Sequence, residues 1–467
     1  MSMTPDVDVI VAGGGIAGAA TAAALQQLGY DVMVVEPGQH DERRLAGELF
    51  HPPGVSGLAE LGLLPTLSEQ PAATLSGFSV YCKEEHIRLP YDAVPNHGVR
   101  GLCLEHRLIR QRLLDAVTGL PNVVVKYGTR VVAIDQSNRS HVAVGVGNGK
   151  GAAVYHCRML VIADGSPSRL ARLAGIAVHQ RRISTVWAYR IGTANLPQRD
   201  FGHVFVGAAT PILLYPLSRD SARMLFDIPY RSGCRPTAAD CVALAHELPD
   251  TLREEITHAI GTGHRMSVVT RATTTDHIAC GRVVLVGDAG GCCHPLTATG
   301  MTMSVSDALL LRQAVAERSD NIPAALQLYE RRRCWPQATR LVLADALRDA
   351  FCGTTPELRV VRGGILALWR DSAQTRSATV ALLSTADGRP LALMRRILAV
   401  MVRGLIVHWR NPKPENKGIG VFVVARALLA TFVRNIKQVL RGTTVVRYRP
   451  AGTAEHPRPL PAATHDA

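Results

Sequence analysis

The sequence has few charged residues and lacks several familiar catalytic signatures. Charged side chains make up 19% of the chain, against roughly a quarter in ordinary soluble domains, which predicts a surface with an apolar region. No G-x-S-x-G, H-E-x-x-H or C-x-x-C segment occurs, so the serine hydrolase, zinc peptidase and paired-thiol signatures are excluded. The chain of 467 residues is 47% hydrophobic, which excludes general disorder and fits one nucleotide-binding body with a dependent substrate region.

The cysteines and the net charge bear on the cellular compartment and on the classes of partner that the protein can bind. The ten cysteines are scattered, and the adjacent Cys292 and Cys293 have a poor geometry for a disulfide or a zinc site. This pattern favours a reducing compartment. No basic segment followed by an apolar run opens the chain, so we expect neither a cleaved signal nor an N-terminal membrane anchor. The net charge of +14 fits a nucleic acid, an anionic membrane or an acidic partner, because a diffuse positive field attracts all three.

The first segment predicts a dinucleotide-binding turn. An apolar strand over residues 8–12 leads into a glycine-rich turn and an alanine-rich helix over residues 19–28. The helix N-terminus offers free NH groups to a pyrophosphate, and Glu36 at the end of a second strand can accept hydrogen bonds from a ribose. The residues expected at the cofactor are Gly13, Gly15, Ile16, Ala17, Gly18, Glu36 and Pro37. This unit alone leaves FAD and NAD open.

Two later strands end in aspartates and favour FAD. Residues 161–165 end in Asp164-Gly165 and resemble the DG motif of flavoprotein hydroxylases, although an ordinary strand-to-turn Asp-Gly is the alternative. Residues 282–289 end in Gly287-Asp288-Ala289 and resemble the GD motif, whose aspartate bonds the ribityl chain of FAD. The alternative for Asp288 is a helix cap. His294, beside Pro295, either caps and packs or lies near the flavin.

Several longer strings resemble the squalene epoxidase family. Residues 44–54, RLAGELFHPPG, are similar to its R-x-x-G-E-x-x-Q-P-G-G segment, and residues 294–306, HPLTATGMTMSVS, to its HPLTGGGMTVALS stretch. Residues 58–63, 210–215 and 223–228 resemble further strings of the family, so that the similarity runs from about Asp8 to about Gly442. The resemblance implies an FAD-binding domain of Rossmann type with a β-sheet substrate domain.

The resemblance also assigns site residues. It implies that FAD is contacted by Glu36, Arg44, Arg107, Val131, Asp288 and Met301, with Pro295 and Gly300 in the same segment as Met301. Glu48 lies in the segment that borders the substrate cavity and is counted among the cofactor positions. His51 stands where the family has glutamine, Phe78 where it has tyrosine, and Ala298-Thr299 where it has two glycines. With His294, His51 and Phe78 are the candidates near the reacting centre, and these departures favour a substrate with other polar demands than squalene.

The C-terminal part changes character and predicts membrane attachment. Two apolar helices with dispersed basic residues are expected over 391–409 and 419–440, and their arginines exclude a clean membrane span. They fit a monotopic anchor, while the alternative is a helical bundle over the substrate domain. We expect a discontinuous FAD domain (1–185 and 270–345) interleaved with substrate strands around 75–105, a substrate domain (186–269), a helical region (346–448) and a disordered tail (449–467).

The predicted activity is epoxidation of a carbon–carbon double bond of squalene or a related isoprenoid. The expected route is a flavin 4a-hydroperoxide that reacts with the alkene, with molecular oxygen as co-substrate. No second glycine fingerprint marks an NADPH domain, so we expect electrons from NAD(P)H directly or through a separate reductase. The expected location is the cytoplasmic face of a membrane, without a nucleic-acid partner. The alternatives are an aromatic hydroxylase, a prenyl reductase and a lipid-binding escort without turnover.

Overall fold

The first layer of the fold is an eight-stranded sheet whose centre is parallel. We describe the computed structural model over residues 5–38, 45–68, 72–82, 85–93, 99–148, 151–207, 209–230 and 235–410, with helical pieces at 425–427, 429–430, 433 and 436–437. The path of the sheet is β17 (Ala279–Cys280), β18 (Val283–Leu285), β11 (Ala152–Ile162), β1 (Val7–Ala12), β2 (Val32–Glu36) and β8 (Val123–Tyr127), with β9 (Arg130–Asp135) and β10 (Val142–Gly147) beside β11. Strands β18, β11, β1, β2 and β8 pair in parallel.

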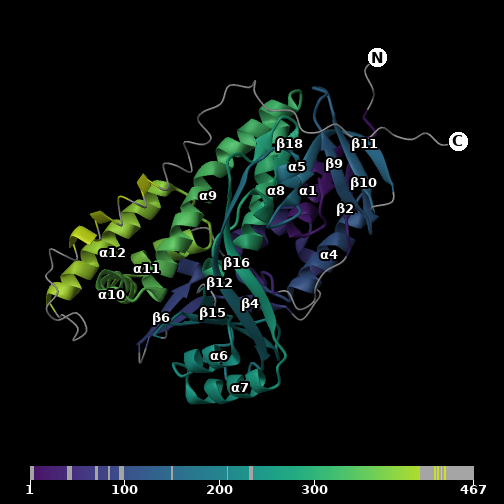
Figure 1. Ribbon diagram of the computed structural model, residues 1–467. Helices are drawn as coiled ribbons and strands as arrows, with labels where there is room; N and C mark the ends of the chain where they lie inside the picture. Colours follow the sequence, from purple (N-terminus) through teal and green to yellow (C-terminus); the bar gives the residue numbers. More distant parts are fainter. Residues whose placement is uncertain are drawn as a thin grey trace.

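Helices cover this sheet as the sequence predicts for a Rossmann-like domain. Helix α1 (Ile16–Gln26) packs against α4 (His106–Thr118) and α8 (Gly300–Glu317), while the short α5 (Arg169–Leu173) follows β11. Strand β1 has no exposed residue and α1 is built almost entirely of small buried side chains, so that helix and sheet approach closely. Figure 1 shows these elements gathered at one end of the molecule.

The second layer is a seven-stranded sheet that carries the predicted substrate strands. Its order is β16 (Met266–Thr275), β12 (Val178–Ile191), β15 (Ala222–Pro229), β14 (Ile212–Pro216), β13 (Phe201–Phe205), β5 (Gly77–Cys82) and β6 (Glu85–Pro90). Helices α6 (Ala238–Ala245) and α7 (Asp250–Gly261) pack on it (Figure 1). The long strands β12 and β16 cross the boundaries expected at 185/186 and 269/270, and the division into domains stays a prediction.

Short elements join the two sheets around residues 49–103. A three-stranded sheet contains β3 (Leu49–Phe50), β7 (Gly101–Cys103) and β4 (Ala73–Leu75), and two helices lie between them in the chain, α2 (Pro52–Glu60) and α3 (Leu64–Ser68). Of the three 3₁₀ turns in the described residues, η1 (Tyr91–Ala93) follows β6, while η2 (Gly287–Gly290) and η3 (Pro295–Thr297) lie between β18 and α8. Because α2 packs on α8, the segment around residues 49–103 lies against the Rossmann-like domain.

The last four helices run from α8 to one flank of the molecule, where the final three lie together (Figure 1). They are α9 (Ile322–Cys352), α10 (Pro356–Asp371), α11 (Ala373–Leu383) and α12 (Pro390–Arg410). Helices α10 and α12 cross closely at Gly364. A Cβ on this residue would lie 2.3 Å from the carbonyl oxygen of Val400, so a larger side chain would not fit. Within the residues that the structure describes, no helix combines the length and apolarity needed to cross a bilayer. The expected tail lies outside those residues, as does most of the second expected helix.

Candidate functional site

The glycine-rich turn opens the site at the end of β1. Gly13 has a φ of +114°, and a Cβ there would lie 2.5 Å from the carbonyl oxygen of Ala163, so only glycine fits this turn without strain. A Cβ on Gly18 would lie 1.8 Å from the carbonyl oxygen of Gly13. Gly15 precedes α1 and has open space beside it. The first NH groups of α1 therefore border a space that a phosphate can enter.

Glu36 is fixed at the end of β2 beside this turn. Its carboxylate accepts a hydrogen bond from the NH of Gly14 at 2.7 Å and another from the NH of Gly38 at 2.8 Å. The side chain is buried, while the neighbouring Pro37 is exposed. The carboxylate is thereby held in one orientation near the start of α1, where a ribose can donate to its remaining lone pairs.

Asp164 caps a helix in this structure. Its carboxylate accepts hydrogen bonds from the NH groups of Arg169 and Leu170 at 3.0 and 3.1 Å, at the start of α5. Burial raises the pKa of Asp164, and the hydrogen bond with Ser168 and those with the helix NH groups oppose part of this rise. The guanidinium of Arg169 in turn donates to the carbonyl oxygen of Val131 at 3.3 Å. Asp164 and Val131 thus share one hydrogen-bonded cluster, and their contact with FAD stays a prediction.

The carboxylate of Asp288 faces the beginning of α8. A Cβ placed on Gly300 would lie 3.8 Å from its Oδ1 atom, and it makes no hydrogen bond with another described residue. Burial raises the pKa of Asp288, and the positive charges of Arg340 and Arg333 offset part of that rise. Asp288 is partly buried, and an acceptor there without a partner among the described residues fits a ligand hydroxyl, which is what the ribityl chain of FAD offers.

The turn that carries Asp288 touches the first turn of α1. A Cβ on Gly287, whose φ is +60°, would lie 2.7 Å from the Cβ of Ala17. Ile16 is buried next to this contact. The glycine-rich turn and the distant aspartate turn, separated by most of the chain, therefore border the same space. The two candidate halves of the dinucleotide site fit one molecule of FAD.

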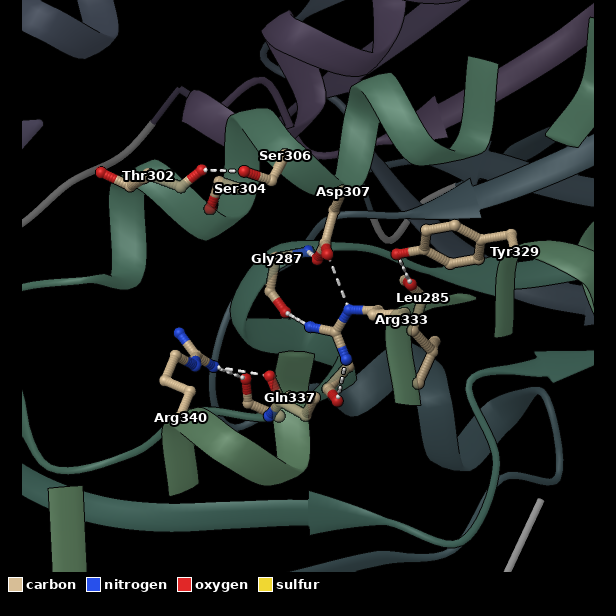
Figure 2. A network of polar contacts seen from close by, with 12 residues as sticks. Leu285, Gly287, Thr302, Ser304, Ser306, Asp307, Tyr329, Arg333, Gln337 and Arg340 are labelled. Atoms are coloured by element: carbon tan, nitrogen blue, oxygen red, sulfur yellow. Dashed lines mark hydrogen bonds and ion pairs between the residues drawn. The ribbon is translucent and has the colours of Figure 1, made fainter. Parts of the chain in front are cut away.

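A buried ion pair between Asp307 and Arg333 fixes the turn Gly287–Gly290 that carries Asp288, as Figure 2 shows. Asp307 on α8 accepts from the NH of Gly287 at 2.8 Å and from Nε of Arg333 at 2.8 Å. The two remaining nitrogens of Arg333 donate to the carbonyl oxygens of Gly290 and Gly287 at 2.9 and 3.1 Å. Burial alone would lower the pKa of Arg333, but the charge and hydrogen bond of Asp307, together with Tyr329 and Asp288, outweigh burial and raise the pKa. The turn is fixed at both ends.

Arg340 extends this network by one helical turn (Figure 2). Its Nη2 atom donates to the carbonyl oxygen of Gly291 at 2.9 Å and to Oε1 of Gln337 at 3.0 Å. Neither Arg333 nor Arg340 is among the site residues predicted from the sequence. The only signal was the run of three arginines at 331–333, of which one had to face the core of an amphipathic helix.

His51 connects three segments at the edge of the site. Its Nε2 atom lies 2.9 Å from the carbonyl oxygen of Thr297, so Nε2 donates and Nδ1 accepts from the hydroxyl of Tyr91 at 2.7 Å. Its backbone NH donates to the hydroxyl of Thr302 at 2.9 Å. Burial lowers the pKa of His51 to about 4, although the Thr297 carbonyl works in the other direction. The imidazole is therefore neutral near pH 7.

Phe78 lies beside this pair. Its ring centroid is 6.0 Å from that of His51 and 6.2 Å from that of Tyr91, in tilted and edge-on arrangements. The other side of the ring packs on Gly202, where a Cβ would lie 2.6 Å from the phenyl ring. The structure thus brings two of the predicted pocket residues together and adds Tyr91, which the sequence analysis did not identify.

His294 caps the turn that ends at Thr297 and uses both ring nitrogens. Its Nδ1 atom accepts from the NH of Leu296 at 3.2 Å, which caps the turn η3. Its Nε2 atom lies 2.9 Å from Oδ2 of Asp227 on β15. Both side chains are buried. His294 thereby ties the loop before α8 to the second sheet, and its role near the flavin stays a prediction.

Glu48 forms a second buried ion pair in the segment between the sheets. Arg223 on β15 donates Nε and Nη2 to the two carboxylate oxygens at 3.0 and 2.8 Å, and the hydroxyl of Tyr215 donates to Oε2 at 3.1 Å. All three side chains are buried. This bidentate pair fixes the segment before His51 to the second sheet.

The remaining predicted residues lie at three places. Met301 is buried in the first turn of α8, 3.1 Å from where a Cβ on Gly47 would lie, next to Gly300. Pro295 is exposed in η3 and Arg107 is exposed near the start of α4. Arg44 lies outside the described residues. The contacts of all these positions with FAD stay predictions.

The loop before α8 carries backbone strain at Ala298. This residue has a φ of +51°, in the left-handed region that favours glycine. The squalene epoxidase string to which residues 294–306 are similar has glycine at this position, and alanine retains the turn here at a conformational cost. The neighbouring Thr299 precedes α8, and its hydroxyl lies 3.1 Å from that of Thr297.

Comparisons with known proteins agree on the family and on the fold. The squalene epoxidase family model matches residues 156–416, and the pyridine nucleotide-disulphide oxidoreductase model matches residues 7–208. Squalene epoxidase 1 of Arabidopsis thaliana is 28% identical over 462 residues, covering 94% of this chain and 86% of the relative. Squalene monooxygenase SE2 of Panax ginseng is 27% identical over 462 residues, covering 94% and 84%.

A solved structure with the same fold is that of Klebsiella pneumoniae HpxO complexed with FAD and uric acid. It has a TM-score of 0.70 and 22% sequence identity, and the match covers 82% of this chain and 98% of that one. Similarity at this level supports the fold. The predicted Rossmann-like α/β fold is confirmed.

Proposed function

Because the chain belongs to the squalene epoxidase family of FAD-dependent monooxygenases, we propose that it epoxidises a carbon–carbon double bond of squalene or a related isoprenoid. The observation that carries the proposal is the carboxylate of Asp288, which has no hydrogen-bond partner among the described residues. It lies in the turn that contacts Ala17 and faces Gly300 at the start of α8. FAD, when bound there, supplies the activation of molecular oxygen. The oxygen-transfer route expected from the sequence stays a prediction.

The residues of the chain have distinct tasks in this proposal. The start of α1 and Glu36 bind the pyrophosphate and the ribose, and Asp288 binds the ribityl hydroxyls. Arg333 and Asp307 hold the Asp288 turn in place without touching the cofactor. His51 stays neutral and fixes the loop at Thr297, so that the reacting centre is positioned and shielded from water rather than supplied with a proton donor.

We also propose that the enzyme works at the cytoplasmic face of a membrane. The side chains of Leu391, Leu398, Val402 and Trp409 on α12 are 62%, 48%, 48% and 71% exposed. Their spacing of seven, four and seven residues places them on one face of the helix. An exposed apolar stripe flanked by arginines fits a headgroup region with anionic lipids. Sedimentation with phosphatidylglycerol vesicles, and its loss on Leu398→Glu, tests this proposal.

The source of electrons completes the proposed reaction. NAD(P)H supplies them, and we infer that a separate reductase passes them on, because the sequence contains one glycine fingerprint and not two.

The experiment that tests the function uses the full chain with FAD, NADPH, a reductase and a panel of polyprenyl compounds. The expected product carries one added oxygen atom derived from molecular oxygen. Loss of a double bond without oxygen gain would identify a prenyl reductase instead, and binding without turnover would identify a lipid-binding protein.

A further inference from the structure

A cleft of about 660 Å³ is lined by residues of the edge strand β6 and of α10 and α11. Figure 1 shows these three elements close together. Strand β6 is the last strand of the second sheet, and both helices pack on it. The volume falls in the range of roughly 300–1,000 Å³ that is usual for small-molecule sites. None of the residues assigned to FAD lines this cleft. It is therefore a second concave site beside the flavin site.

The charges that line the cleft are mostly of one sign. Arginines from four segments contribute to it, and among the described residues of the lining Asp92 is the only carboxylate. These arginines are Arg88, Arg100, Arg370 and Arg376. A concave surface with an excess of positive charge attracts anions more strongly than a flat one, because its walls exclude water.

Most of this positive charge is not neutralised. Among the residues that the structure describes, the guanidinium groups of Arg88 and Arg100 have no hydrogen-bond or ion-pair partner, although the backbone of Arg88 pairs with Ser79 in the sheet. Arg376 donates to the carbonyl oxygens of Trp369 and Arg370 at 2.7 and 3.4 Å, which leaves its charge in place. Arg370 lies 3.4 Å from Glu85, and both of these side chains are about half exposed. Such an exposed pair is weak and can open to a ligand.

The inner wall of the cleft is aromatic and adjoins the flavin site. Phe201, Trp369 and Tyr91 line it and are otherwise buried. The hydroxyl of Tyr91 donates to His51, whose other nitrogen donates to Thr297 in the loop before α8. The cleft thus has a cationic mouth and an apolar end that is two hydrogen bonds from the loop beside Asp288.

We propose that this cleft binds the acidic end, a carboxylate or a phosphate, of an amphipathic isoprenoid substrate. The proposal rests on the proposed function, since it names the class of substrate that the flavin site oxidises. Guanidinium groups match the planar geometry of carboxylate and phosphate oxygens and form paired hydrogen bonds with them. The isoprenoid chain lies along the aromatic wall and reaches toward His51 and Phe78.

An anionic lipid headgroup offers the same chemistry as the acidic end of a substrate. The buried aromatic wall, whose Tyr91 contacts His51, favours the substrate, because a headgroup held in the membrane has no need of an apolar surface at this end of the cleft. The exposed apolar stripe of α12 is a different surface and contributes no residue to the cleft.

Binding of three probes with the same ten-carbon chain tests this proposal. Geranyl phosphate, geranic acid and geraniol are titrated into the full chain, and binding is followed by calorimetry and by tryptophan fluorescence. The variant Trp369→Phe serves as the reference that identifies the contribution of Trp369 to the fluorescence change. We expect both acids to bind at least about tenfold more tightly than geraniol, since charge-assisted hydrogen bonds are the stronger ones. In Arg88→Gln/Arg100→Gln the acids should bind no more tightly than geraniol.

The matched control removes two arginines elsewhere. Arg318 and Arg331 are exposed and do not line the cleft, so Arg318→Gln/Arg331→Gln should keep the preference for acids. Thermal unfolding and FAD content verify that each double variant is folded. If Arg88→Gln/Arg100→Gln does not fold, the single variant Arg100→Gln replaces it, and we then expect a partial loss of the preference for acids.

Two results would overturn the proposal. One is equal binding of geraniol and the acids, or a preference that survives in Arg88→Gln/Arg100→Gln. The other is that only phosphatidylglycerol vesicles bind in an arginine-dependent way, which would assign the cleft to a lipid headgroup. Calorimetry and fluorescence measure binding and do not require turnover. A chain that binds the acids but does not insert oxygen would therefore refute the proposed function without refuting the binding site.

Discussion

The hydroxyl of Tyr91 lies 2.7 Å from Nδ1 of His51, and this contact joins the cationic cleft to the loop before α8. Two family positions differ here, since histidine replaces glutamine and Phe78 replaces tyrosine. The phenolic hydroxyl that Phe78 lacks is supplied next to His51 by Tyr91, whose ring centroid is 6.2 Å from that of Phe78. We infer that the two departures form one local unit.

Removal of the Tyr91 hydroxyl tests this unit. Tyr91→Phe leaves the buried Nδ1 of His51 without a donor, and an unsatisfied buried group costs about 1–3 kcal/mol. We expect a loss of that size in the free energy of unfolding, together with slower epoxidation. Chemical denaturation of the variant measures it, and Tyr230→Phe, in an exposed ring, is the control that should change little. Wild-type stability in Tyr91→Phe would show that the contact contributes nothing.

The lowered pKa of His51 predicts a pH dependence of stability. The unfolded imidazole binds a proton below its usual pKa of about 6.5, whereas the folded one resists until about 4. Stability is therefore complete above pH 6.5 and is lost as the pH falls toward 4, with a loss of about 2 kcal/mol between pH 7 and pH 5. His203, with a pKa that burial also lowers to about 4, contributes in the same direction.

The variant His51→Gln isolates the share of His51. Its unfolding free energy should fall by about 2 kcal/mol less than that of the wild type over the same pH interval. Denaturant titrations at pH 7 and pH 5 measure both proteins. Parallel losses in the two proteins would mean that His51 is protonated equally in the folded and unfolded states.

The buried pair of Arg333 and Asp307 predicts a large effect for a single substitution. Arg333→Met leaves the carboxylate of Asp307 buried and unpaired, which costs about 3–5 kcal/mol, and it releases the turn that presents Asp288. We expect a lower melting temperature and weaker FAD binding. Arg332→Met is the matched control, because Arg332 is the next residue and pairs with Glu317 at the surface. Equal effects of the two substitutions would contradict the network.

Asp288 is expected to act on the cofactor and not on the fold. Its partly buried carboxylate has a raised pKa, so Asp288→Ala should leave the stability of the FAD-free protein unchanged or higher. FAD affinity should fall about tenfold with the loss of hydrogen bonds to a charged acceptor. Fluorescence titration of FAD measures this, with Asp320→Ala as an exposed control. Full flavin content and turnover in Asp288→Ala would remove the assignment.

Phe78 is expected to act on the substrate. Phe78→Tyr adds a hydroxyl beside His51 and should change the order of preference among polyprenyl substrates without changing FAD content. Competition assays with pairs of substrates measure the preference. An unchanged order would separate Phe78 from the reacting centre.

The parts of the fold that the sequence predicts are those set by local patterns. The strand, glycine-rich turn and helix near the N-terminus are encoded within about thirty residues, and the strand ending at Asp288 has the same short-range signature. The contact of Gly287 with Ala17 follows from parallel strands that end at one edge of a sheet. These features could be placed without any knowledge of tertiary packing.

Pairs of polar residues that are distant in sequence could not be predicted in this way. Glu48 and Arg223 are 175 residues apart, and His51 and Tyr91 are 40 apart. Each pair depends on how the insertion around residues 49–103 packs between the two sheets. Among the arginines at 331–333, burial alone decides that Arg333 holds the aspartate turn. Periodicity indicates that one of them is buried, but it does not name the partner.

The most direct test is the amount of FAD that the purified full chain retains after incubation with the cofactor and gel filtration. The site built from the glycine-rich turn, Glu36 and Asp288 predicts a yellow protein with about one FAD per chain, and a much lower ratio for Asp288→Ala. Well-folded protein that stays colourless in the presence of excess FAD would contradict the assignment of this site.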